Sequence, residues 1–395
     1  MRVKFNDPDF SFQFLRVLGS AASRQADAGE CFATAYRIVE GDFESWTKEW
    51  TRTADRVAAG ALKSAESQHN ISAADAYLRA ANYYRAAEFY LHGNPTDPRI
   101  QELSGRGAQC FREGLRTGGT THQWLEIPYE GTTLPGIFYP ASSGRGPVLI
   151  AQTGFDGTID GLFPWAQAAT RRGWHCLTFE GPGQGRVIRK QGLPFRPDWE
   201  HVISAVVNHL VTRSEVDEKR IALLGVSFGG YLAPRAAAFE KRLAACIANG
   251  GVLDFSGPRM PKDKTREEYA SLIRSHPDQV NAKMRKMAEQ SVGAQWAQEN
   301  GQYTFGASSP AEWLSKLLDY DLTQVAGQIT CPVLVVDVEN ENNFPGEARK
   351  LYEALICPKT WLYFTEEEGA GDHCQTGSPA LAQQRILDWL QEAVA

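Results

Sequence analysis

From residue 124 onward, the sequence alternates short apolar runs with amphipathic stretches of helical period. The runs that predict strands are 124–129, 132–139, 148–152, 175–179, 221–224, 244–248, 332–336 and 360–364. The stretches that predict helices are 162–172, 198–212, 229–239 and 380–394. Repeated strand–helix–strand units build a mostly parallel sheet with helices on both faces. The sequence therefore predicts an α/β fold with a doubly wound sheet.

The chain before this region has a different pattern. Residues 1–118 contain several helical stretches and almost no alternation of period two, which predicts a helical N-terminal domain. Within it, Ser72 and Asp75 are spaced like a capping box that opens a helix running to about residue 91. Paired glycines and threonines at 116–121 predict the linker to a second domain, 119–395. Strand patterns disappear between about 254 and 330, which predicts a helical lid inserted into that domain.

The composition argues against several classes of function. The 395 residues carry 41 basic and 47 acidic side chains, a net charge of −6, with no basic stripe that would attract a phosphate backbone. No run approaches the roughly 18 apolar residues of a membrane span, and the first residues lack the apolar core of a signal peptide. Seven cysteines stand singly, which predicts a reducing, cytoplasmic setting. We therefore expect no nucleic-acid partner and no membrane association.

A G-x-S-x-G match lies at a predicted strand-to-helix junction. Gly225-Val226-Ser227-Phe228-Gly229 follows the apolar run 221–224 and opens the helical stretch 229–239. Small residues at 225 and 229 permit a tight turn that exposes the Ser227 hydroxyl above the sheet. The position of the match, more than its letters, predicts that Ser227 is a nucleophile rather than an incidental serine in a glycine-rich turn.

A serine hydroxyl needs a base to take its proton. The chain has eight histidines, and His373 alone follows the last predicted strand, in the loop 366–374. The other histidines lie in the helical region, before Ser227 or in the predicted lid. The chain order of nucleophile, acid and histidine in this architecture places the base after the last strand, so we expect His373 to be the base.

The acid that orients this base is expected in the turn after the predicted strand 332–336. Three carboxylates compete there, Asp337, Glu339 and Glu341. Glu341 is favoured because it lies several residues past the strand end and just before an apolar-Pro step, and the other two remain alternatives. Asp372 is disfavoured because a sequence neighbour of His373 is badly placed to accept its Nδ1 proton. The acid would fix the imidazole tautomer and stabilise the imidazolium.

The oxyanion of a tetrahedral intermediate needs hydrogen-bond donors. We expect one from the Phe228 backbone N–H and the other from Phe155, in the glycine-containing loop 153–158 after the strand 148–152. The segment Gly181-Pro182-Gly183-Gln184-Gly185 is not expected to bind phosphate, because it lacks a Lys-Ser/Thr pair and Pro182 removes a backbone donor. No clustered Cys/His spacing predicts a metal, and no cofactor is expected.

Together these residues resemble the α/β-hydrolase fold from about residue 120 to the end. The segments 179–185, 196–200 and 369–375, with the N-terminal helices, resemble a group that contains 2,6-dihydroxypseudooxynicotine hydrolase and fungal hydrolases that shorten polyketide pigment precursors. This resemblance implies cleavage of a carbon–carbon bond beside a ketone in an aromatic or polyketide-like small molecule. Glu341 stands where related enzymes usually have aspartate.

The resulting hypothesis is a serine hydrolase with a helical N-terminal domain and a helical lid. Four aromatic residues of the predicted lid are candidates for substrate binding: Trp296, Tyr303, Phe305 and Trp313. A carboxylesterase or acyl-peptidase is the alternative enzyme, and a catalytically inactive binding module is the alternative of another class. The sequence leaves open whether the protein is a homodimer.

Overall fold

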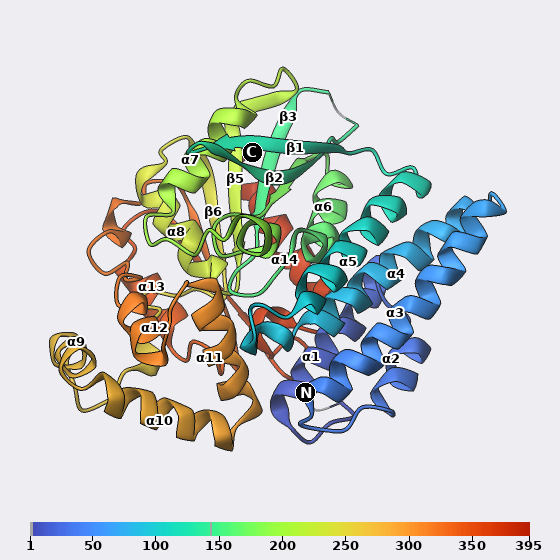
Figure 1. Cartoon of the computed structure of the whole chain (residues 1–395). Helices are drawn as coiled ribbons and strands as arrows, with labels where there is room; N and C mark the ends of the chain where they lie inside the picture. Colours follow the sequence, from blue (N-terminus) through green and yellow to red (C-terminus); the bar gives the residue numbers. More distant parts are fainter. Residues whose placement is uncertain (1–2, 143) are drawn as a thin grey trace. The chain divides into compact units, whose positions relative to one another are not determined.

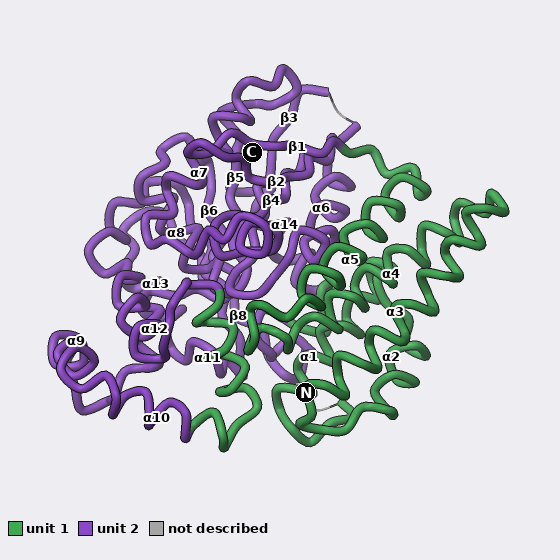
Figure 2. Tube along the Cα trace, in the orientation of Figure 1, with its two compact units in different colours: residues 1–122, 287–303, 376–380 green, residues 123–286, 304–375, 381–395 purple. Residues whose placement is uncertain are grey.

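The computed structural model describes residues 3–142 and 144–395, which form two compact units (Figure 2). Unit 1 contains the chain up to His122 together with Met287–Tyr303 and Thr376–Ala380. Unit 2 contains Gln123–Lys286, Thr304–Gln375 and Leu381–Ala395. Each unit is therefore assembled from segments that are far apart in the sequence.

Unit 1 consists of helices (Figure 1). They are α1 (Pro8–Gly19), α2 (Ala28–Ala35), α3 (Phe43–Glu66), α4 (Asn70–Glu88), α5 (Pro98–Thr117) and α11 (Val292–Thr304, all but its last residue), with the short turns η1 (Ser20–Ser23) and η2 (Leu91–Gly93). α4 packs against both α3 and α5. Its alanines are buried, and Ala80 and Ala81 fully so, because small side chains let the neighbouring helices approach closely.

The start of α4 differs from the prediction. Ser72 and Asp75 lie inside the helix, which begins at Asn70 and has no side-chain hydrogen bond at its N-cap. α3 ends at Glu66, and Gln68 adopts a φ of 62°, so the chain reverses and re-enters a helix at once. The capping-box prediction was wrong because this tight turn, made without glycine, sets the start of the helix.

Unit 2 is built on an eight-stranded sheet (Figure 1). Its strands are β1 (Gln123–Tyr129), β2 (Thr132–Tyr139), β3 (Gly146–Gln152), β4 (His175–Phe179), β5 (Val216–Val226), β6 (Leu243–Asn249), β7 (Val333–Val338) and β8 (Lys359–Phe364). The strand order is β1-β2-β4-β3-β5-β6-β7-β8, with β1–β2 and β2–β4 antiparallel and all later neighbours parallel. The predicted α/β fold with a mostly parallel sheet is confirmed.

Helices of unit 2 pack on this sheet. The helices wholly or mainly in this unit are α6 (Phe163–Thr170), α7 (Glu200–Leu210), α8 (Gly229–Phe239), α9 (Arg266–Ser275), α10 (Pro277–Gln290), α12 (Pro310–Leu317), α13 (Glu347–Ala354) and α14 (Pro379–Ala393). The short helical turns are η3 (Ile159–Leu162), η4 (Val187–Gln191), η5 (Gly257–Arg259), η6 (Ala326–Gln328) and η7 (His373–Gln375). α6 packs on β3 and β4, α8 on β5 and β6, and α13 on β7. Every residue of β3 is buried, as a parallel strand covered on both faces requires.

Two details of unit 2 differ from the expected element pattern. β7 continues to Val338, so Asp337 lies within a strand, opposite Tyr363 of β8, and not in the turn that follows. α13, between β7 and β8, was not predicted. Four helices, α9 to α12, occupy most of the region where strand patterns disappear, and Met287–Tyr303 from this region belongs to unit 1.

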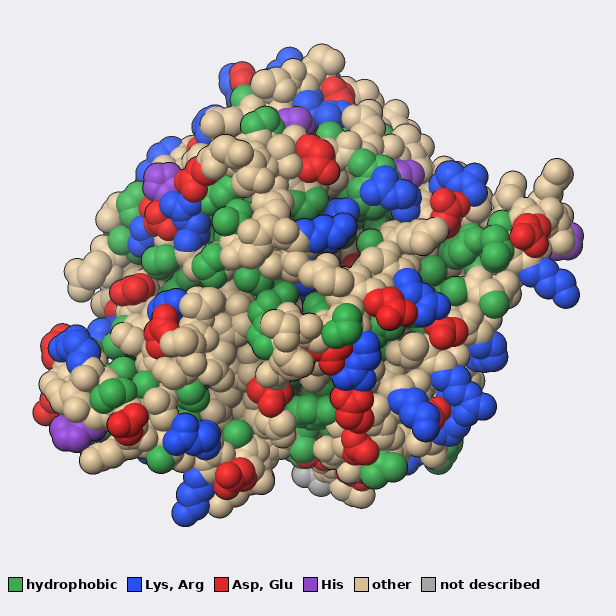
Figure 3. Space-filling view, in the orientation of Figure 1, with side chains coloured by type: hydrophobic (Ala, Val, Ile, Leu, Met, Phe, Trp, Pro, Cys, Tyr) green, Lys and Arg blue, Asp and Glu red, His purple; other side chains and the backbone are tan. Residues whose placement is uncertain are grey.

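Charged side chains of both signs are interspersed on the face seen in Figure 3. Such mixing fits a modest net charge of −6 and produces no large single-sign patch on that face. Across residues 3–142 and 144–395, no helix is both long enough and apolar enough to span a bilayer.

Candidate active site

Ser227 lies at the sharp turn between β5 and α8. Its φ of 63° is a left-handed backbone conformation that residues with a side chain rarely adopt. The turn is so tight that a Cβ at Gly225 would lie 1.9 Å from the Gly229 oxygen, and one at Gly230 would lie 2.1 Å from the Gly250 oxygen. Only glycine fits at these two positions, and Gly225 is the first glycine of the motif. A Cβ at Gly229, the second glycine of the motif, would lie 2.9 Å from the Thr153 oxygen.

His373 lies in the loop after β8, within hydrogen-bond distance of the candidate nucleophile Ser227. Its Nε2 atom is 2.8 Å from Ser227 Oγ, and its Nδ1 atom is 2.6 Å from Glu341 Oε2. The loops that carry His373 and Glu341 are joined by a backbone hydrogen bond of 2.8 Å from Asn340 N–H to the Gly371 oxygen. The structure thus brings together the three residues that the sequence singled out, in the order serine, imidazole, carboxylate.

Glu341 is held by its own loop as well as by the imidazole. Its Oε1 atom accepts hydrogen bonds from the backbone N–H groups of Asn343, at 2.9 Å, and Phe344, at 3.1 Å. Burial favours the neutral carboxylic acid, but the charge and hydrogen bond of His373 and these two N–H groups favour the carboxylate. Their sum holds the pKa of Glu341 below its ordinary value.

The two alternative carboxylates make other contacts. Asp337 accepts a hydrogen bond from the Val338 N–H at 2.9 Å, and its pKa is raised, mainly by burial. Glu339 is exposed and accepts a hydrogen bond from the Glu366 N–H at 2.7 Å. Among these three carboxylates, Glu341 is the one within hydrogen-bond distance of His373.

Cys374 is a further polar neighbour of the candidate base His373. It adopts a φ of 53°, and its Sγ atom lies 3.4 Å from His373 Nε2 and 3.5 Å from the Asn249 carbonyl oxygen. Burial lowers the pKa of His373, but Cys374 and Glu341 raise it by charge and hydrogen bonding, and the resulting pKa lies well above the ordinary value. Only the position of this cysteine beside the histidine could have indicated the contact from the sequence.

The loop after β3 packs directly against the nucleophile turn. A Cβ at Gly154 would lie 2.5 Å from the Phe228 nitrogen, so only glycine lets the two backbones meet. Phe155 follows in this loop and Phe228 follows the nucleophile, and both are buried. The two predicted oxyanion donors thus belong to backbone segments in direct contact.

Gln184, which the sequence analysis did not identify as functional, fixes this loop. Its Nε2 atom donates to the oxygens of Thr153, at 2.8 Å, and Gly154, at 3.3 Å, while its Oε1 atom accepts from the Gly181 N–H at 3.0 Å. Glu180 accepts from the Ile159 and Arg186 N–H groups, both at 2.8 Å. The glycine-rich segment after β4 therefore holds the loop after β3 in place through buried hydrogen bonds. In the sequence, the single glutamine of this segment was the one feature that could have indicated this role.

The four candidate aromatic residues separate into two pairs. The Phe305 ring centroid is 6.2 Å from that of Phe155 and 6.0 Å from that of Phe228, and Trp313 is a buried residue of α12 in the same unit. Trp296 belongs to unit 1, where it stacks on Phe89 at 4.6 Å. Tyr303, also in unit 1, lies 5.1 Å from the His92 ring. Phe305 is thus in ring contact with both predicted oxyanion residues.

No group of three or more His, Cys, Asp or Glu side chains in the described part of the chain is arranged to hold a metal ion. What the site does offer is a hydroxyl, an imidazole and a carboxylate in line. This arrangement can transfer the serine proton to the imidazole as the oxygen attacks an electrophilic carbon.

Comparison with known proteins identifies the family of this chain. Residues 13–276 match the model of the family described as Esterase FrsA-like. The chain is 34% identical to Hydrolase LUC6 of Fusarium sp., over 97% of this chain and 96% of that protein. It is 33% identical to 20-hydroxy-prefusarin hydrolase FUS2 of Gibberella moniliformis, over 100% of this chain and 99% of that protein.

A solved structure shares the fold across both units. The crystal structure of 2,6-dihydroxy-pseudo-oxynicotine hydrolase superposes with a TM-score of 0.74, with 96% of each chain covered and 22% sequence identity. At 22% identity this similarity supports the fold alone. The family assignment rests on the family match and on the relatives that are more than 30% identical. The chain belongs to the FrsA-like esterase family and is a hydrolase of the α/β-hydrolase fold.

Proposed function

We propose that this hydrolase works through a serine nucleophile, with Ser227 attacking the substrate, His373 moving the proton and Glu341 orienting the imidazole. The observation that carries the proposal is the continuous hydrogen-bond chain, 2.8 Å from Ser227 to His373 and 2.6 Å from His373 to Glu341. Both distances lie in the range of hydrogen bonds able to transfer a proton.

The proposed reaction has two halves. Ser227 Oγ adds to the substrate carbonyl carbon while its proton passes to His373 Nε2, and the oxyanion accepts hydrogen bonds from the N–H groups of Phe155 and Phe228. Collapse of this intermediate expels the leaving group, which takes the proton from the imidazolium. Water, deprotonated by His373, then attacks the acyl-serine and releases a carboxylic acid and free Ser227.

For the substrate, we propose an aromatic or polyketide-like ketone that is cleaved at a carbon–carbon bond. The leaving group must then be a stabilised carbanion, such as an enolate or an electron-rich aryl carbon that His373 protonates. The resemblance of segments 179–185 and 369–375 to the group of carbon–carbon hydrolases supports this bond type. FUS2, a 33% identical relative, bears the name 20-hydroxy-prefusarin hydrolase. The ring contacts of Phe305 with Phe155 and Phe228 support an apolar substrate region.

Ester hydrolysis is the second candidate, and the family match favours it because the family is named for an esterase. The same nucleophile, base and oxyanion donors cleave an ester, whose alkoxide leaving group needs less stabilisation than a carbanion. The two candidates therefore differ in the leaving group and share every protein residue.

A substrate panel tests the proposal and separates the candidates. Purified protein is incubated with β-diketones, aryl ketones and aryl esters, and the products are identified by mass. Ser227→Ala should lower turnover by about 10³-fold or more with the fold preserved. A fluorophosphonate should label the wild-type protein at Ser227. A Ser227→Ala protein that keeps a tenth of the activity, or a wild type that is neither labelled nor active, would contradict the serine mechanism.

We also propose that the protein works in a reducing, cytoplasmic compartment. All seven cysteines carry free thiols, and four of them are buried: Cys31, Cys110, Cys176 and Cys246. Burial raises the pKa of Cys176, which suits an apolar packing role rather than redox chemistry. Localisation of a tagged protein in its native cell tests this setting, and sedimentation tests whether it is a homodimer.

A further inference from the structure

Arg259 is a charged residue placed among aromatic rings. It ends the turn η5, in the segment between β6 and α9, and its side chain is half-buried. Its Cζ atom lies 4.6 Å from the ring centroid of Phe255, 5.6 Å from that of Phe344 and 5.9 Å from that of Trp313. The rings stabilise the guanidinium through their π faces but accept none of its hydrogen bonds strongly.

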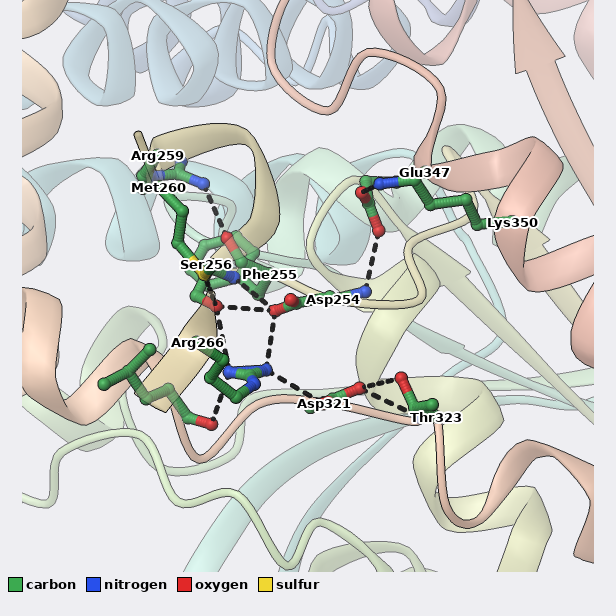
Figure 4. Close-up of polar contacts among 11 residues, drawn as sticks. Asp254, Phe255, Ser256, Arg259, Met260, Arg266, Asp321, Thr323, Glu347 and Lys350 are labelled. Atoms are coloured by element: carbon green, nitrogen blue, oxygen red, sulfur yellow. Dashed lines mark hydrogen bonds and ion pairs between the residues drawn. The ribbon is translucent and has the colours of Figure 1, made fainter. Parts of the chain in front are cut away.

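Most of the hydrogen-bonding capacity of Arg259 is unused. A guanidinium has five N–H donors, and the one hydrogen bond from this side chain to the described residues runs from Nη1 to the Phe255 carbonyl oxygen, at 2.8 Å (Figure 4). No carboxylate of the described residues forms an ion pair with it. Burial lowers the pKa of Arg259 to about 10, which still leaves the guanidinium charged at neutral pH.

The neighbouring Arg266 is paired with carboxylates, unlike Arg259. Arg266 lies 3.0 Å from both Asp254 and Asp321 (Figure 4). Asp254 lies on the same segment as Arg259, but its carboxylate also accepts hydrogen bonds from the N–H and hydroxyl of Ser256. The hydrogen bonds and ion pairs in Figure 4 thus hold the segment that carries Arg259, and in them Asp254 and Asp321 bind partners other than Arg259.

Two of the rings that contact Arg259 also contact the candidate active site. The Phe255 ring stacks on Phe228, the residue after the nucleophile, with centroids 4.0 Å apart. The Phe344 ring lies 5.7 Å from the His373 ring. The aromatic rings that contact the guanidinium are therefore also neighbours of Phe228 and His373.

Trp313, whose ring contacts Arg259, has an unused hydrogen-bond donor. The indole Nε1 of Trp313 is buried and has no hydrogen-bond partner among the described residues. Buried polar groups of this kind cost free energy unless an acceptor satisfies them. Arg259 and Trp313 thus supply a positive charge and N–H donors that the acceptors of the described residues leave partly unused.

We propose that Arg259 binds a carboxylate carried by the substrate, at a distance from the carbonyl that Ser227 attacks. A carboxylate matches the fork of the guanidinium and can accept two parallel hydrogen bonds from it. The proposal deepens the proposed function and rests on it, since it assigns an anionic substrate class to the same site. In this proposal Arg259 determines which substrates bind, and Ser227 and His373 cleave the bond.

Matched esters test the proposal. Mono-p-nitrophenyl esters of succinic, glutaric, adipic and pimelic acid each carry one free carboxylate, and their neutral counterparts have that carboxylate capped as a methyl ester. The ratio of kcat/KM for each anionic ester to that of its neutral partner is measured by nitrophenolate release. For the chain length that fits, the wild-type ratio should be about 10 to 100, the gain of a charge-assisted hydrogen bond. This preference should shrink as salt concentration rises.

Substitutions at position 259 identify the source of the preference. Arg259→Gln should bring the ratio close to one, and Arg259→Lys, which keeps the charge but not the fork, should retain part of it. Arg349 is a matched control, because it also lies over a ring, that of Trp361 at 5.6 Å, but is exposed and paired with Glu353 at 2.8 Å. Arg349→Gln should leave the ratio and the activity unchanged.

The outcomes are separable. A wild-type ratio near one for every chain length, or equal ratios in wild type and Arg259→Gln, would overturn the role of Arg259 while leaving the serine mechanism intact. No turnover of any ester, with no fluorophosphonate labelling, would remove the serine mechanism and the Arg259 assignment with it. If Arg259→Gln does not fold, the wild-type ratio and the Arg259→Lys variant still decide the question.

Discussion

The side-chain amide of Gln184 donates a 2.8 Å hydrogen bond to the carbonyl oxygen of Thr153, and this bond ties the segment after β4 to the loop that carries Phe155. A loop held in this way presents its backbone N–H groups without reorganisation when an oxyanion forms. Replacing Gln184 with methionine keeps the length of the side chain and removes the donor. We expect kcat to fall by about 10- to 100-fold, with a smaller change in KM.

Gln191 provides the control for this prediction. It also donates a side-chain hydrogen bond to a backbone oxygen, that of Thr133 at 2.9 Å, but it lies on the surface. Gln191→Met should therefore leave kcat close to the wild-type value. Steady-state kinetics and a thermal melt are measured for both variants, and equal effects of the two substitutions would contradict a special role for Gln184.

The identity of the triad acid can be decided by charge-neutral substitutions. Glu341→Gln keeps the volume but removes the charge that stabilises the imidazolium, so activity should fall by about 100-fold or more. Asp337→Asn should cost less, because Asp337 lies within β7 and is bonded to the Val338 N–H. Initial rates of the two variants are compared on one substrate. The reverse order would make Asp337 the acid.

The pH dependence of the reaction should reflect the raised pKa of His373. Burial acts to lower this pKa, but Cys374 and Glu341 raise it by more, so the imidazole holds its proton to a higher pH than an ordinary histidine. A protonated imidazole cannot accept the serine proton, so kcat/KM should fall as pH drops through this pKa.

In Glu341→Gln the charge that favours the imidazolium is absent, so the acidic limb of the residual activity should move to lower pH. A profile of kcat/KM against pH for both proteins measures this shift. An unmoved limb would mean that Glu341 has no electrostatic effect on the base.

Phe305 and Trp296 should differ in their effect on substrate choice. Phe305 contacts the rings of Phe155 and Phe228, whereas Trp296 stacks on Phe89 in unit 1 and donates its indole N–H to the Phe89 oxygen at 3.2 Å. Phe305→Ala should lower turnover of a bulky aryl ketone far more than turnover of p-nitrophenyl acetate. For Trp296→Ala we expect mainly a lower melting temperature. Parallel losses on both substrates for Phe305→Ala would mean that this residue only fills space.

The strands and the nucleophile turn were the most predictable parts of the chain. β2, β4 and α8 begin and end where the sequence pattern placed them, because buried apolar runs and glycines mark their limits directly. The approach of His373 to Ser227 could be expected from chain order alone. In each case a local pattern coincides with a requirement of the fold.

Other features depend on contacts that no local pattern records. Asp337 reads as a turn residue, but pairing with β8 extends β7 through it. Gln68 adopts a left-handed backbone conformation although it is not glycine, so no sequence pattern marks the start of α4. No sequence pattern indicates Arg259 as a substrate-binding residue. The structure shows that Asp254 and Asp321 are paired with Arg266 and that Arg259 has no carboxylate partner among the described residues.

The division into units has a consequence for engineering this enzyme. Met287–Tyr303 and Thr376–Ala380 are grouped with the N-terminal helices, although both segments are flanked by chain that belongs to unit 2. A single cut after His122 would leave these two segments attached to a fragment that lacks the rest of their unit, including the Phe89 ring on which Trp296 stacks. Chimeras between relatives should therefore exchange the three segments of unit 1 together. With a single crossover point, the segments of unit 1 would come from two different parents and would have to pack against each other.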